Sequence, residues 1–224
     1  MTQGEECYPK LVVFDLDACC WFPEMYMMSS GPPYKKVKGN MNKMVASNGE
    51  EVKLLGITRA VWALLQAPCG RFRNTRVAIA SRCDEPAWAR ELLKLFEAAP
   101  DVSFWDVCEK GDLVEIYKGS KKGHFKALQK KTGIAFEDMC FFDDDPVNIR
   151  DVSSLGVVCV LTPDGVTSDA WEKGLRDYAK AHGKPIPAAV APEPEPPKAE
   201  EPKAEPPKAE EPSKPLPWYK ASPP

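Results

Sequence analysis

Two aspartates, Asp15 and Asp17, stand one residue apart directly after the apolar run Leu11–Phe14. The run predicts a buried strand, and side chains alternate along a strand, so both carboxylates point to one side and Leu16 to the other. Two like charges this close repel unless a cation lies between them, and hard oxygen ligands suit Mg²⁺. The pair therefore favours a magnesium site. Two solvated acids on a loop are the alternative that so short a motif leaves open.

A second acidic cluster, Asp143, Asp144 and Asp145, follows the short apolar run 139–142. A proline comes next, which suits the first position of a helix. Aspartates also cap helix N-termini, and Asp145 is the residue we expect to do so. If the other two meet Asp15 in one crevice, they destabilise the fold unless a cation joins them.

A hydroxyl and an ammonium lie between the two clusters. The strand Arg76–Ser81 ends in the hydroxyl, and Lys121 and Lys122 precede a helical stretch. These groups are what a phosphoryl group needs around it. A serine in this place is also a common turn residue, and a lysine at a helix start is commonly solvated. The adjacent lysines leave open which of the two would act.

Strands and helices alternate along residues 10–181. The expected strands are 11–14, 76–81, 102–107, 139–142 and 157–161, and the expected helices are 58–66, 86–98, 121–131, 146–155 and 168–181. This alternation predicts an α/β fold, a three-layer sandwich with a Rossmann-like parallel sheet and helices on both faces. Right-handed crossovers bring the strand ends to one edge, where distant motifs can meet.

Asn48-Gly49, between the apolar segments 44–46 and 52–54, predicts a hairpin. A hairpin insertion at about 35–55 would project over the strand ends, either as a minimal cap or as a plain surface hairpin. We expect residues 1–184 to form one domain.

Residues 185–224 hold most of the 23 prolines, mixed with Glu and Lys. Such a segment cannot bury enough apolar surface to fold, so we expect a disordered tail. It is either a spacer or a docking segment. Residues 216–219, the Leu-Pro-Trp-Tyr stretch, are the expected anchor for a proline-recognition partner.

The 224 residues carry a formal net charge of −3 without a basic stripe, which argues against nucleic-acid binding. Eight cysteines without a CxxC pair and only two histidines argue against zinc. Several cysteines fall in apolar strands and are expected to be reduced. The polar N-terminus and the lack of a long apolar run argue against targeting and membrane segments, so the cytoplasm is the expected compartment.

The order of these motifs resembles the haloacid dehalogenase (HAD) superfamily of phosphohydrolases, and within it the magnesium-dependent phosphatase family, which has a HAD-like fold with little cap. The matching motifs are FDLD (14–17) with Trp21, ASR (80–82), GSKKGHF (119–125), KTGI (131–134), FFDD (141–144), Asn-Ile (148–149) and DVSSLGV (151–157). The resemblance covers roughly residues 10–178.

The resemblance implies that Asp15 is the nucleophile, which forms an aspartyl-phosphate. It implies that Asp17 is the general acid and later the base, with its main-chain carbonyl on the metal. The implied phosphate-binding residues are Leu16, Ser81, Arg82 and Lys121, with Lys122 as the alternative lysine. The implied Mg²⁺ ligands are Asp15, Asp17, Asp144 and Asp143.

Cys19 and Cys20 occupy positions where the family usually has Thr or Val, then Leu. Cysteine fits the space but is a weaker hydrogen-bonding partner. Because both acids of the first motif are present, we expect a working Mg²⁺-dependent phosphomonoester hydrolase. The expected substrate is a phosphorylated protein side chain such as phosphotyrosine, or a small sugar phosphate. The alternative is a catalytically degenerate HAD-like binding module with an interaction tail. An open site argues against transfer to an alcohol, which requires water to be excluded.

Overall fold

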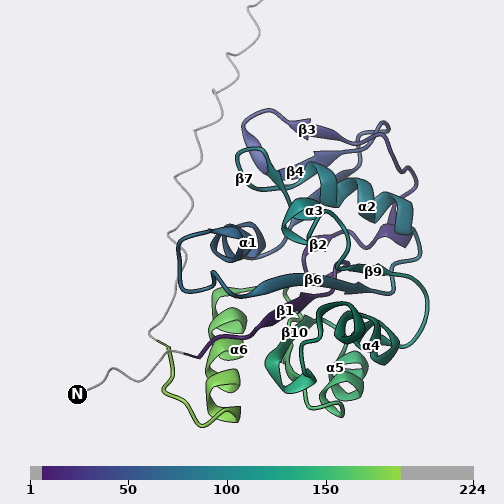
Figure 1. The fold of residues 1–224 in the computed structure, drawn as a ribbon. Coiled ribbons are helices and arrows are strands. Elements are labelled where there is room, and N and C mark those ends of the chain that lie inside the picture. The colour runs from purple at the N-terminus through teal and green to yellow at the C-terminus, as the bar shows by residue number, and fades with distance from the viewer. Residues whose placement is uncertain (1–6, 188–224) are drawn as a thin grey trace, which may run out of the picture. The chain divides into compact units, whose positions relative to one another are not determined.

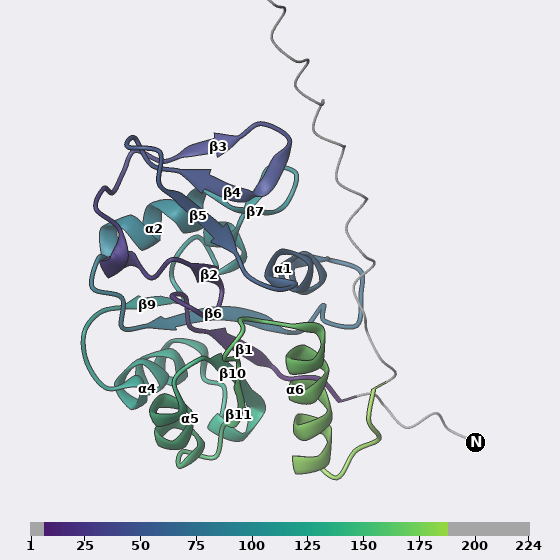
Figure 2. The same ribbon diagram turned by 180° about the vertical axis from the view of Figure 1, so that it is seen from behind.

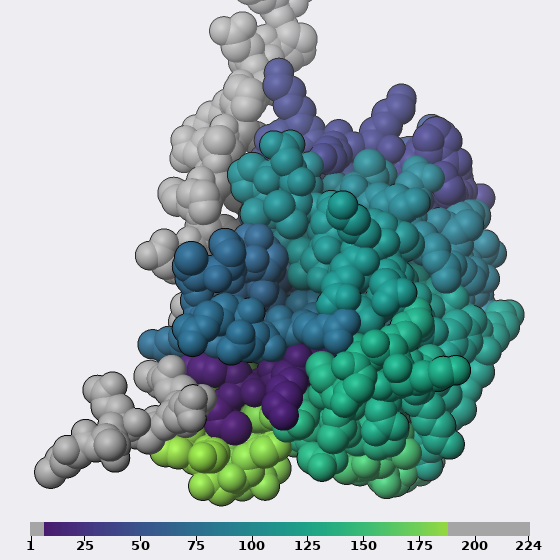
Figure 3. Space-filling view, in the orientation of Figure 1, coloured from purple at the N-terminus to yellow at the C-terminus, as the bar shows by residue number. Residues whose placement is uncertain are grey.

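The computed structural model describes residues 7–187 of the chain. Nearly all of the predicted tail, including its expected anchor at 216–219, lies outside the described residues. Figure 3 shows the described residues closely packed, with the first of them (purple) between the segment around α1 (blue) and α6 (yellow-green). Within residues 7–187, no helix combines the length and the apolar composition needed to cross a bilayer.

The main sheet has five parallel strands in the order β11-β10-β1-β6-β9 (Figure 1). These strands are β1 (Leu11–Phe14), β6 (Arg76–Ser81), β9 (Val114–Ile116), β10 (Met139–Asp143) and β11 (Val158–Leu161). The helices are α1 (Thr58–Gln66), α2 (Pro86–Leu95), α3 (Phe104–Val107), α4 (Lys121–Thr132), α5 (Pro146–Ser153) and α6 (Ser168–Ala181). Two 3₁₀ turns, η1 (Met25–Met27) and η2 (Phe136–Asp138), complete the helical elements of the described residues.

Helices pack on both faces of this sheet, because successive side chains of its buried strands point in opposite directions. On β10, Phe141 meets Phe125 of α4 edge-on at 4.9 Å, while Phe142 stacks on Trp171 of α6 at 5.6 Å. On the same face as α6, Phe142 also stacks on Phe14 of β1, and Phe14 in turn contacts α1, so α1 covers this face as well. Helix α5 lies beside α4 (Figures 1 and 2). The predicted three-layer α/β fold is confirmed.

A second sheet is antiparallel and lies over one end of the first (Figure 2). Its order is β2-β5-β4-β3, with β2 (Trp21–Phe22), β3 (Lys35–Val37), β4 (Asn40–Val45) and β5 (Glu51–Leu54). The turn between β4 and β5 contains Asn48 and Gly49, and Gly49 has a φ of +92°, which glycine adopts without strain. The sheet therefore contains more than a hairpin, because β2 ties it to the segment just after β1.

The predicted strand 102–107 is wrong from Phe104 onward. The segment contributes only β8 (Val102–Ser103), which pairs with β7 (Glu97–Ala99), and then turns into α3. Ser103 and Asp106 form a capping box, in which the Ser103 hydroxyl accepts the Asp106 N–H at 3.1 Å, and this starts the helix. The edge strand β9 takes the place of the predicted strand in the parallel sheet.

Candidate active site

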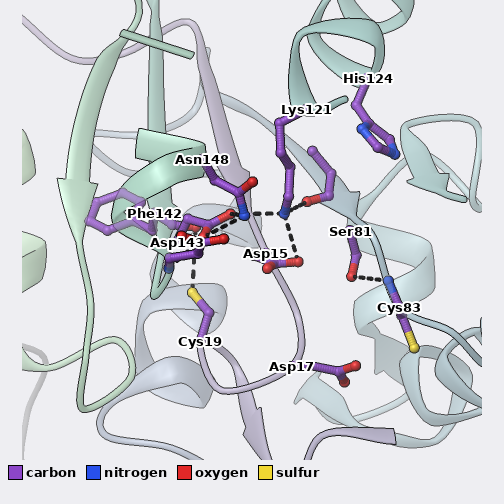
Figure 4. Close-up of polar contacts among 12 residues, drawn as sticks. Asp15, Asp17, Cys19, Ser81, Cys83, Lys121, His124, Phe142, Asp143 and Asn148 are labelled. Carbon is purple, nitrogen blue, oxygen red and sulfur yellow. Dashed lines mark hydrogen bonds and ion pairs between the residues drawn. The ribbon is translucent and has the colours of Figure 1, made fainter. Parts of the chain in front are cut away.

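The carboxyl ends of β1, β6 and β10 meet at a cavity of about 600 Å³. The walls of this cavity include five of the predicted site residues: Asp15, Asp17, Ser81, Arg82 and Asp144. Figure 4 shows how several of these side chains converge from separate strands. The parallel sheet thus brings the distant motifs to one place, as the crossover rule requires.

An acidic cluster lies at the cavity, where two of its three members, Asp15 and Asp144, line the wall. Carboxylate oxygens of Asp15, Asp143 and Asp144 all lie within 4.8 Å of one another. Burial raises the pKa of Asp144 to about 7 and that of Asp143 to about 6, and the charge of Asp15 adds to both shifts. Hard oxygen donors gathered at this spacing fit a divalent cation such as Mg²⁺.

Lys121, the first residue of α4, inserts its ammonium into this cluster. It is 2 % exposed, and its Nζ lies 2.9 Å from Asp15 Oδ1 and 2.8 Å from Asp143 Oδ2. Nζ also donates to the main-chain oxygen of Ala80 at 2.6 Å. Burial acts to lower the pKa of Lys121, but the charges of Asp15 and Asp143 outweigh it and hold this pKa above its usual value. One ammonium among three carboxylates leaves two negative charges uncompensated when all three are ionised, which matches a divalent cation.

Of the two adjacent lysines, Lys121 is the one that reaches the cluster. Lys122 is half-buried on the next position of α4, and the structure shows no ion pair between it and these carboxylates. The helix begins here because the Ser120 hydroxyl accepts the N–H of Lys122 at 3.3 Å, a capping contact.

Asp17 lines the cavity but lies apart from the acidic cluster. Its Oδ1 accepts a hydrogen bond from the indole nitrogen of Trp21 at 2.7 Å. Burial raises the pKa of Asp17 to about 6, against the opposing effect of the Trp21 hydrogen bond. A carboxyl group with a pKa near neutrality can give up and take back a proton under ordinary conditions.

The predicted phosphate-binding residues lie in different settings. Ser81 is buried at the end of β6, where its hydroxyl accepts the N–H of Cys83 at 3.3 Å, and Arg82 is exposed at the rim. The Leu16 side chain is buried in the core, as strand alternation predicts, so only its main chain could contact a ligand. Its carbonyl oxygen accepts the N–H of Cys20 at 2.7 Å.

Asn148 is a site residue to which sequence reasoning gave no role. Its amide nitrogen donates to both carboxylate oxygens of Asp143, at 3.1 and 3.2 Å, and it lines the cavity. The sequence signal that could have indicated this role is the position of Asn148 in the first turn of α5, directly after the acidic cluster. Asp145 caps α5 as predicted, because its Oδ1 accepts the N–H of Val147 at 2.7 Å.

A parallel α/β sheet whose strand ends gather carboxylates, a buried lysine and a hydroxyl has the architecture of a phosphohydrolase. The chain belongs to the Acid Phosphatase family, whose sequence model matches residues 7–181. The resemblance to HAD-type phosphatases is confirmed.

The proteins similar to this chain include two curated relatives and one solved structure. Human Magnesium-dependent phosphatase 1 is 37 % identical over 186 residues, which cover 83 % of this chain and 96 % of the relative. The HAD-like hydrolase superfamily protein P8B7.31 of Schizosaccharomyces pombe is 33 % identical over 152 residues, 67 % of this chain and 83 % of the relative. The structure of CbbY from Rhodobacter sphaeroides in complex with phosphate matches with a TM-score of 0.44 and 11 % identity, covering 68 % of this chain and 85 % of that chain.

Proposed function

We propose that this protein is a Mg²⁺-dependent phosphomonoester hydrolase that works through an aspartyl-phosphate on Asp15. The observation that carries the proposal is the contact of buried Lys121 with both Asp15 and Asp143 in a cluster with room for a cation. The printed name of the human relative, a magnesium-dependent phosphatase, supports the choice of metal.

In this proposal an oxygen of Asp15 attacks phosphorus, and the bond from phosphorus to the leaving oxygen breaks. Asp17 gives its proton to that oxygen and later takes a proton from the water that hydrolyses the aspartyl-phosphate. Lys121 and the Ser81 hydroxyl hold the phosphoryl oxygens. Asp15, Asp143 and Asp144, with the main-chain carbonyl of Asp17, would hold Mg²⁺, which supplies positive charge beside the phosphoryl group.

For the leaving group, we propose the side chain of a phosphorylated protein, with phosphotyrosine as the first choice. Tyr26 is 60 % exposed and lines the cavity, so an aromatic leaving group can pack on its ring. The acidic rim residues Glu24 and Asp84 could instead accept the hydroxyl groups of a sugar phosphate. Measuring kcat/KM for a panel of phosphotyrosine peptides and sugar phosphates would decide between the two substrate classes. Tyr26→Ala should lower kcat/KM for the phosphotyrosine peptides and leave that for the sugar phosphates unchanged.

The decisive experiment measures hydrolysis of 4-nitrophenyl phosphate with Mg²⁺ and with a chelator. We expect turnover that requires the metal and falls at least about a thousandfold in Asp15→Asn. Asp164→Asn is the matched control, because Asp164 is exposed and outside the cavity. An acid-quenched covalent phosphate adduct should appear on wild type and not on Asp15→Asn. If a broad phosphomonoester panel gives no turnover, the chain is instead a binding module.

The cytoplasmic location of the protein and the binding of its tail to a proline-recognition domain stay predictions. The eight cysteines are free thiols, which fits a reducing compartment such as the cytoplasm. A proline-recognition domain that binds a peptide of residues 212–224, and not its Trp218→Ala form, would support the docking segment.

A further inference from the structure

Three tryptophans, Trp21, Trp62 and Trp171, are completely buried, and they differ in what their indole nitrogens meet. Within the described part of the chain, the nitrogens of Trp62 and Trp171 have no hydrogen-bond partner. The nitrogen of Trp21 donates to Asp17 at 2.7 Å. Trp21 therefore has a polar role that the other two core tryptophans lack.

The position of the Trp21 ring is fixed by elements other than β1. As part of β2 it pairs with Leu54 of β5, and its ring stacks with that of Phe96 at 6.2 Å. Ala18, with a φ of +57°, folds the chain back, and its N–H donates to the Trp21 carbonyl at 2.9 Å. The second sheet thus positions the indole of Trp21 beside Asp17, which follows strand β1 of the first sheet.

The contact restricts Asp17 in two ways. An indole N–H can only donate, so Oδ1 of Asp17 must accept, and a proton on this carboxyl group is confined to Oδ2. The bond also holds the side chain in one orientation at the cavity, which Asp17 lines. One oxygen is thereby held by the protein while the other carries the proton.

We propose that Trp21 is the positioning residue for the acid step, because it fixes which oxygen of Asp17 donates the proton to the leaving group. This inference rests on the proposed role of Asp17 as general acid. As the bond from phosphorus to the leaving oxygen breaks and the bond to Asp15 forms, the proton passes from Oδ2 of Asp17 to the leaving oxygen. The new carboxylate stays bound to the Trp21 N–H.

The test compares phenyl phosphate with 4-nitrophenyl phosphate, which have similar shapes but differ in how much protonation the leaving oxygen needs. Because kcat/KM includes leaving-group departure and excludes later hydrolysis of the enzyme-bound phosphate, it isolates the acid step. Trp21→Phe should lower kcat/KM about tenfold or more for phenyl phosphate, and less than about threefold for 4-nitrophenyl phosphate. Trp62→Phe is the matched control and should change both values equally.

A double-mutant cycle separates this inference from the proposed function. In an Asp17→Asn background, Trp21→Phe should cause no further loss on either substrate. Equal losses on both substrates in Trp21→Phe, or none, would overturn the inference while leaving the phosphatase intact. Turnover that persists in Asp15→Asn would instead remove the proposed function. If Trp21→Phe does not fold, β-(3-benzothienyl)alanine at position 21 carries the test, because it keeps the shape of the indole ring and replaces its N–H by sulfur. The same shift of about tenfold in the substrate ratio is expected, and an unchanged ratio counts against the inference.

Discussion

The ammonium of Lys121 and the carboxylate of Asp15 lie 2.9 Å apart, with side chains only 1 % and 11 % exposed. Removing the lysine leaves Asp15 and Asp143 as buried acids without their shared cation. Lys121→Met should therefore lower turnover at least about a hundredfold and destabilise the fold by about 3–5 kcal/mol. Steady-state kinetics and urea unfolding measure the two effects. Lys122→Met is the matched control and should change neither by much, and an equal loss in both variants would contradict the assignment of Lys121.

Magnesium affinity should fall as the pH is lowered. Without the metal, the pKa of Asp144 is about 7 and that of Asp143 about 6, so protons must leave these groups before a cation binds. Above about pH 7 both are ionised and affinity is highest, whereas below about pH 6 protons compete with the metal. Calorimetric titration of Mg²⁺ across this range checks the trend, with Asp144→Asn as a weak-binding comparison. Affinity independent of pH would show that these carboxylates are not the ligands.

Cys19→Thr should preserve or raise activity and stability. The Cys19 sulfur lies 3.4 Å from the Phe142 carbonyl oxygen and accepts from the Thr162 hydroxyl at 3.4 Å, so the position is polar although buried. A threonine hydroxyl can make the same contacts as a stronger donor and acceptor. Cys19→Val, which has the same shape as the threonine variant, should be less stable than it by about 1–2 kcal/mol. Thermal unfolding with kinetics measures both variants, and a collapse of the threonine variant would refute this account.

Two glycines inside helices should respond to alanine with opposite signs. A Cβ on Gly174 of α6 would lie 2.6 Å from Phe142 Cζ, so Gly174→Ala forces the helix away from β10. We expect a destabilisation of about 1–3 kcal/mol. Gly123 of α4 has nothing within 4 Å of the same point, so Gly123→Ala should stabilise by about 0.5–1 kcal/mol through helix propensity alone. The urea concentration at the midpoint of unfolding measures both effects. Shifts of the same sign in the two variants would contradict the close packing of α6 on β10.

Removing residues 185–224 should leave kcat/KM unchanged within about twofold, because the proline-rich composition of this segment predicts no packed structure. The same substrates used for the full chain provide the measurement. A large loss would make the tail part of the catalytic unit.

The parts of this fold that depend on long, regular patterns could be predicted from the sequence. The apolar runs that precede Asp15 and Asp143 are unbroken, and such runs bounded by acids or turns leave little choice of structure. The meeting of Asp15 with Asp144 at one edge of the sheet then follows from the handedness of crossovers, whereas the strand order was not predicted.

The features that depend on short or tertiary signals could not be predicted. The edge strand Val114–Ile116 has three residues, too few for a periodic pattern, and Ser103 with Asp106 turned an apolar stretch into a helix. The Trp21–Asp17 hydrogen bond requires the positive φ of Ala18, a conformation that alanine rarely adopts and that no local rule predicts.

Strand β1 lies in the middle of the five-stranded sheet, with hydrogen-bonded neighbours on both sides, whereas β9 and β11 are its edges. Amide hydrogens of β1 can exchange with solvent only when the sheet itself opens, while the edges can fluctuate locally. We therefore expect the strand that delivers Asp15 to be among the slowest-exchanging segments of residues 7–187. Local fluctuation of the sheet edges would therefore leave the carboxylate of Asp15, the proposed nucleophile, on a rigid support.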